Sequence, residues 1–116
     1  MINIAIIDQN ETYRKSLKMV LEQVEGFHVV LESGEYSCLK GDDEITIQVL
    51  LINYSPGNRK CAEQISEASM NRNFLKSLIL VMYKDELNLD FDEADVILKS
   101  SSKKEFEKRI RELVGS

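Results

Sequence analysis

The chain has 116 residues, 43% apolar and 30% charged, and its 15 basic and 20 acidic side chains give a net charge of −5. This length and composition predict one domain, residues 1–116, with a buried core. The acidic balance argues against a nucleic-acid-binding surface and against binding to anionic membranes. The sequence shows no transmembrane-length apolar run and no signal peptide, so we expect a cytoplasmic protein.

The first quarter of the chain predicts a strand, a helix and a second strand. Residues 2–7 (INIAII) form an apolar run typical of a buried strand, and Asn10 suits the N-cap of the following helix. Gly26 is expected to end that helix, and residues 27–31 to form the second strand. The helix has one apolar face, which consists of Tyr13, Leu17, Val20, Leu21 and Val24.

The rest of the chain predicts three more strands and two more helices. The strands are expected within residues 45–52, at 78–82 and at 94–98. A helix across 58–71 would turn Cys61, Ile65 and Ala68 inward. The last helix has a capping-box start, Ser102 to Glu105, and an apolar face made of Phe106, Ile110, Leu113 and Val114.

Five short apolar strands separated by helices predict an α/β fold with a parallel, doubly wound sheet that is covered on both faces. In such a sheet, ligands bind beyond the carboxyl ends of the strands. The residues that follow strands one, three, four and five are Asp8 and Gln9, Asn53, Met82 and Tyr83, and Lys99 and Ser100. We therefore expect any site at this edge.

Few residues suggest catalysis or a structural metal. His28 lies in an apolar run without a partner, and Cys38 and Cys61 lack metal-ligand spacing. Both cysteines are interpreted as small buried apolar residues. Because no nucleophile–base pair is apparent, an enzyme is the least favoured interpretation.

The order and spacing of these segments resemble the receiver domains of bacterial two-component response regulators over nearly the whole chain. The segments that carry the resemblance are IAIIDQNETYRKSLKMVLEQVEGFHVV, VLLINYSPG, LILVMYKDE and ADVILKSSSKKEFEKRIREL. The resemblance implies a flavodoxin-like five-stranded sheet of order 2-1-3-4-5. Residues 82–94 are fewer than the family's fourth helix usually needs, so that helix is expected to be short or missing.

The resemblance also implies roles for the strand-end residues, and most of them depart from the family pattern. The Mg²⁺-binding acidic pair corresponds to Asp8 and Gln9, and the phosphoacceptor aspartate to Asn53, or to Ile52 if counted back from Pro56. The remaining family positions, a hydroxyl residue, an aromatic switch residue and a lysine, correspond to Met82, Ile97 and Lys99. Only Lys99 matches the family pattern cleanly, which suggests a degenerate pseudo-receiver.

The charges expected at this edge of the sheet also suggest a degenerate site. Mg²⁺ prefers carboxylate ligands with waters and phosphate, and Asp8 is the only remaining candidate ligand at this edge. We expect no cofactor and weak or absent Mg²⁺ binding. Our hypothesis is that Lys99 pairs with Asp8 and with the Asn53 carbonyl; the alternative is that Lys99 points to solvent.

Three functions remain open. The first is a receiver-like module that binds a protein partner or a second copy without phosphorylation; a longer chain could join it to an effector or DNA-binding domain. The second is a phosphorelay receiver of a transcription regulator, phosphorylated at another residue such as Asp8 or a serine. The third is a module that senses a small molecule at the strand ends, near Met82 and Tyr83. Ser100 to Lys104 fit a helix cap and, less well, a phosphate site.

Overall fold

A computed structural model of the chain describes residues 1–35, 47–55, 58–70, 77–82 and 96–115, of which 68–70 and 77–82 are described by their backbone alone. The elements are, in order, β1 (Ile2–Ile7), α1 (Glu11–Glu22), β2 (Phe27–Ser33), β3 (Val49–Asn53), α2 (Arg59–Met70), β4 (Ser77–Met82), β5 (Val96–Leu98) and α3 (Lys103–Gly115). The strands form one parallel sheet of order β2-β1-β3-β4-β5, which confirms the predicted fold class.

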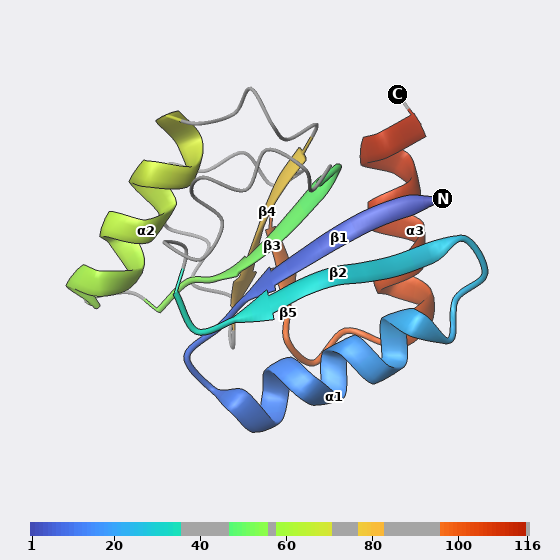
Figure 1. Cartoon of the computed structure of the whole chain (residues 1–116), viewed down its shortest axis with the longest axis horizontal. Helices are drawn as coiled ribbons and strands as arrows, with labels where there is room; N and C mark the ends of the chain where they lie inside the picture. The colour runs from blue at the N-terminus through green and yellow to red at the C-terminus, as the bar shows by residue number, and fades with distance from the viewer. Residues whose placement is uncertain (36–46, 56–57, 71–76, 83–95, 116) are drawn as a thin grey trace.

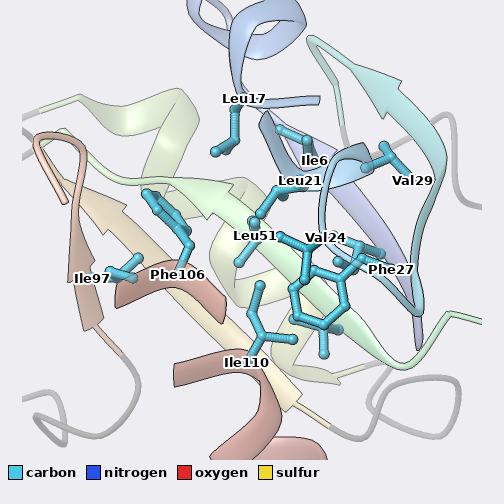
Figure 2. Close-up of a cluster of buried hydrophobic side chains, with 12 residues drawn as sticks. Ile6, Leu17, Leu21, Val24, Phe27, Val29, Leu51, Ile97, Phe106 and Ile110 are labelled. Atoms are coloured by element: carbon cyan, nitrogen blue, oxygen red, sulfur yellow. The ribbon is translucent and has the colours of Figure 1, made fainter. Parts of the chain in front are cut away.

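Helices cover both faces of this sheet. Figure 1 shows α1 and α3 on one face and α2 on the other. Successive side chains of a strand point to opposite faces, so the apolar runs of β1 and β3 supply both cores. Ile4 and Ile6 join the cluster beneath α1 and α3, part of which is drawn in Figure 2, whereas Ala5 and Ile7 join the cluster that contains Ile65 of α2.

The start of α1 follows the prediction, but its end does not. The Asn10 side chain accepts a hydrogen bond from the Tyr13 amide at 3.0 Å, as an N-cap does. The helix ends at Glu22, four residues before Gly26, because the amides of Gln23 and Val24 donate to carbonyls three residues back. Gly26 instead supplies a positive φ of 88° in the turn that leads into β2.

The capping box of α3 is confirmed in full. The Glu105 amide donates to Ser102 Oγ at 3.2 Å, and the Ser102 amide donates to Glu105 Oε1 at 3.1 Å. The capping box therefore fixes the residue at which α3 begins, and with it the end of the turn of residues 99–102 that joins β5 to α3. This matters for the site because Lys99 lies in that turn.

One strand boundary differs from expectation. β2 continues two residues further, to Ser33, where the Ser33 carbonyl accepts a hydrogen bond from the Asp8 amide at 3.0 Å. β3 starts at Val49, inside the predicted range 45–52, and just before it the side chain of Gln48 accepts a hydrogen bond from the Asn3 amide at 2.9 Å. The predictions for the fourth helix, Tyr83 and Cys38 fall outside the described residues. No helix within the described ranges is long and apolar enough to span a bilayer.

Candidate functional site

The parallel sheet brings most of the predicted site residues to one edge. Asp8 follows the last residue of β1, Asn53 is the last residue of β3, and Lys99 follows the last residue of β5. The backbone of Met82, at the end of β4, pairs with Leu98 beside this edge. Side-chain contacts described below join Asp8 to Lys99 and Asn53 to Gln9.

A buried ion pair forms one half of the site. Lys99 Nζ lies 2.8 Å from Asp8 Oδ2, and the two side chains are only 4% and 3% exposed. The other carboxylate oxygen of Asp8 accepts a hydrogen bond from the Asn10 amide at 2.9 Å, and the Asp8 carbonyl accepts one from Arg14 Nη1 at 2.9 Å. The hypothesis that Lys99 pairs with Asp8 is confirmed, and the two opposite charges compensate each other.

Arg14 ties this half of the site to β2. Its guanidinium forms an ion pair with Glu32 in addition to its bond to the Asp8 carbonyl. Because Glu32 belongs to β2 and Arg14 to α1, the backbone at Asp8 is held from two neighbouring elements. Contacts of this kind hold the Asp8 backbone in a defined geometry.

An amide pair forms the other half of the site. Asn53 is 7% exposed, and its Nδ2 donates to Gln9 Oε1 at 3.1 Å, while Gln9 Nε2 donates to the Gly34 carbonyl at 3.3 Å. Asn53 Oδ1 accepts no hydrogen bond from the described residues. The predicted hydrogen bond from Lys99 to the Asn53 carbonyl is therefore wrong, because the ammonium is directed at the carboxylate of Asp8, the stronger acceptor.

Sequence reasoning missed two side chains that contact the site. Cys61 is fully buried, and its Sγ lies 3.6 Å from Asn53 Nδ2 and 3.7 Å from Gln9 Oε1. The Tyr13 ring lies over Lys99, with Nζ 4.4 Å from its centroid, a favourable cation–π geometry. Both lie in the first turn of a helix that follows a site strand, and this placement is the signal that could have identified them.

Asn58 explains how Cys61 reaches the site. Its Oδ1 accepts a hydrogen bond from the Cys61 amide at 3.2 Å, which caps α2 directly after the loop that follows β3. The thiol makes weak contacts to an amide nitrogen and an amide oxygen, so it behaves as a small buried group.

The two isoleucines considered at sequence level lie in the cores. Ile52 is 1% exposed and belongs to the cluster beneath α2, so its side chain does not share the polar contacts of Asn53. Ile97 is 7% exposed and belongs to the same cluster as Phe106 of α3 (Figure 2). Its aliphatic side chain packs in the core and offers no polar atom to the strand ends.

The donor set does not fit a Mg²⁺ ion. Mg²⁺ requires near-octahedral oxygen ligands and is usually held by one or two carboxylates. Asp8 is engaged at both oxygens by Lys99 and the Asn10 amide, and Gln9 Oε1 already accepts from Asn53. A metal would have to displace the buried ammonium, and it would then find a single carboxylate among the strand-end residues that the structure describes.

Comparison with known proteins identifies the fold through similarity to solved structures. No family model and no curated protein sequence matches the chain. The solved receiver domain of the response regulator NarL from Mycobacterium tuberculosis is similar at 17% identity and a TM-score of 0.79, over 99% of this chain and 97% of that one. A response regulator from Thermotoga maritima is similar at 15% identity and a TM-score of 0.79, over 100% and 99%.

A third neighbour is longer than this chain. The response regulator RcsB of Salmonella typhimurium, described for its interaction with DNA, is similar at 22% identity and a TM-score of 0.75. The match covers 97% of this chain but 60% of the RcsB chain. At these identities the likeness shows the fold: the chain has the fold of response-regulator receiver domains.

Proposed function

We propose that this chain is a receiver-like signalling domain that acts through protein–protein contact, without phosphorylation of its strand-end site. The observation that carries the proposal is the buried pair of Asp8 and Lys99, whose side chains are 3% and 4% exposed. In this proposal Asp8, Gln9, Asn53, Met82 and Lys99 occupy the positions of a phosphoacceptor pocket, and Ile97 occupies its switch position.

Charge balance supports this assignment. Three carboxylates in one pocket repel each other and need a cation, whereas one carboxylate and one ammonium attract each other by roughly 4 kcal/mol at 4 Å and an effective dielectric near 20, before desolvation. The pair of Asp8 and Lys99 therefore stabilises the strand ends as they stand. In this proposal, the strand ends fold without a bound metal ion, because their charges already compensate each other.

The chemistry of Asn53 supports the same conclusion. The lone pair of its amide nitrogen is delocalised into the carbonyl, and that nitrogen already donates to Gln9 Oε1. An amide in this state is not a nucleophile toward a phosphoryl donor. Asp8 is a poor substitute, because both of its carboxylate oxygens are engaged and its side chain is 3% exposed.

The partner in this proposal is a protein: a second copy, or an effector domain in a longer chain. The match to 60% of RcsB supports the second possibility, since RcsB carries more chain than the receiver fold. The net charge of −5 argues that this domain itself does not contact nucleic acid. A role in binding, without catalysis, is consistent with the absence of any nucleophile–base pair among the strand-end contacts described above.

The test is phosphoryl transfer itself. The protein is incubated with Mg²⁺ and acetyl phosphate, and its intact mass is measured against a reaction without Mg²⁺. We expect no added phosphoryl group under either condition. A Mg²⁺-dependent phosphoryl adduct would overturn the proposal, and peptide mapping would then show whether Asp8 or a serine carries it, as the phosphorelay alternative requires.

A further inference from the structure

A groove is lined by residues of α1, of α3 and of the turn before α3. Figure 1 shows these two helices on the face of the sheet opposite α2. Its volume is about 370 Å³, and its apolar lining includes Leu17, Val20 and Phe106. Leu17 and Phe106 are 5% and 2% exposed and reach the same core cluster from the two helices (Figure 2). The groove therefore has a floor built from packed core residues and a volume typical of small-molecule sites.

The lining of the groove is basic in an acidic protein. Of the nine residues that line it, all in the described part of the chain, none is Asp or Glu, although the chain has 20 acidic side chains and a net charge of −5. Two of the nine are Lys99, compensated by Asp8, and Lys103, which is exposed. The uncompensated positive charge is thus concentrated at Lys103.

The basic end of the groove coincides with the start of α3. Lys103 is the first residue of that helix, and the lining also includes Ser101 in the preceding turn. The capping box of Ser102 and Glu105 already occupies this helix start, so the positive charge that the groove offers to an anion is that of Lys103. Ser16 of α1 adds a second hydroxyl to the lining. An apolar floor, a cation and two hydroxyls therefore meet in one concave surface.

We infer that this groove binds a small anionic amphiphile, whose apolar body lies on Leu17, Val20 and Phe106 and whose carboxylate or phosphate lies at Lys103 and Ser101. The three apolar side chains of the floor are surrounded by polar ones, so the apolar surface is small. A compact ligand fits such a surface better than a macromolecule would. This groove adjoins the strand-end pair, but the inference does not depend on how the strand-end site functions. Lys99 is the one residue that lines the groove and also belongs to that pair.

The direct test is a titration followed by two-dimensional amide NMR. The probe is decanoate, the matched neutral ligand is decanol, and decyl phosphate tests which anionic head is preferred. We expect saturating shifts at Ser16, Val20, Gln23, Ser101 and Lys103 with either anion, and binding of decanol that is several-fold weaker. Shifts scattered over the molecule, or equal affinity for decanol and decanoate, would overturn the inference.

Substitutions at the rim give a sharper test because they leave the core intact. Lys103→Met should weaken decanoate binding about threefold, the size expected for one exposed charge pair. Gln23→Glu, which adds the missing acid to the lining, should weaken it to a similar extent. The control is Lys104→Met: Lys104 is the next residue of α3, is exposed and does not line the groove. An equal loss in Lys104→Met would mean that the groove is not the site.

Discussion

Two ion pairs in this protein have nearly the same geometry and very different surroundings. Lys99 Nζ lies 2.8 Å from Asp8 Oδ2, and Lys60 Nζ lies 2.9 Å from Glu35 Oε1. The side chains of the first pair are 4% and 3% exposed, whereas those of the second are 55% and 57% exposed. Distance alone would rank the two pairs as equal, so any difference in their effect must come from burial.

Burial changes what each partner needs from the other. An exposed lysine or glutamate that loses its partner is solvated by water, so the pair contributes little to stability. A buried carboxylate that loses its partner remains in a medium that solvates it poorly. Asp8 and Lys99 are therefore mutually dependent, and Glu35 and Lys60 are not.

The largest expected effect is that of Lys99→Met. Removal of the ammonium leaves the Asp8 carboxylate buried without its compensating charge, and we expect a loss of about 3–5 kcal/mol in the free energy of unfolding. Urea denaturation measures this loss. The matched control, Lys60→Met, should change the same quantity by about 0–1 kcal/mol. Equal effects of the two substitutions would show that burial does not separate the pairs.

A double-mutant cycle should give the next largest difference. The coupling energy between Lys99→Met and Asp8→Asn should be about 1–3 kcal/mol, because neutralising Asp8 removes the charge that the first substitution leaves behind. The cycle of Lys60→Met and Glu35→Gln should give about 0.2–1 kcal/mol. Additive effects at Asp8 and Lys99 would contradict the mutual dependence of this pair.

A smaller effect is expected at the helix cap beside Lys99. Ser102→Ala removes the oxygen that accepts from the Glu105 amide and should cost about 1 kcal/mol in the free energy of unfolding. This value should lie between those of Lys99→Met and Lys60→Met. A cost as large as that of Lys99→Met would indicate that the turn between β5 and α3, and not the ion pair, holds the strand ends together.

The smallest effect is expected from an acid introduced at the end of β3. Asn53→Asp alone should not give Mg²⁺-dependent phosphoryl uptake from acetyl phosphate, because position 9 still supplies an amide and Lys99 still engages Asp8. Intact-mass measurement gives the readout. Uptake by this single variant would show that the site lacks only its acceptor.

Much of the fold could be predicted because its signals are local. The apolar runs of β1 and β3, the Asn10 cap and the Ser102–Glu105 capping box each depend on residues a few positions apart. The end of α1 could not be predicted as well. Gly26 is a typical helix stop, but the hydrogen bonds of Gln23 and Val24 end the helix first.

The site could be predicted only in part because its contacts join distant segments. The charge types at Asp8 and Lys99 were enough to predict their pairing once the sheet order was assumed. The direction of the Asn53 amide and the approach of Cys61 depend on how α2 packs after β3, which no local pattern records. Side-chain direction within a crowded site is settled by tertiary packing.

We propose that the strand-end site is compensated by its own residues and needs no metal ion. The most direct measurement is the thermal unfolding of the unmodified protein with and without millimolar Mg²⁺, at ionic strength matched with NaCl. The double variant Gln9→Asp/Asn53→Asp, which restores three carboxylates, serves as the positive control. We predict that Mg²⁺ leaves the midpoint of the unmodified protein unchanged and raises that of the double variant. A saturable rise in the midpoint of the unmodified protein would contradict the claim.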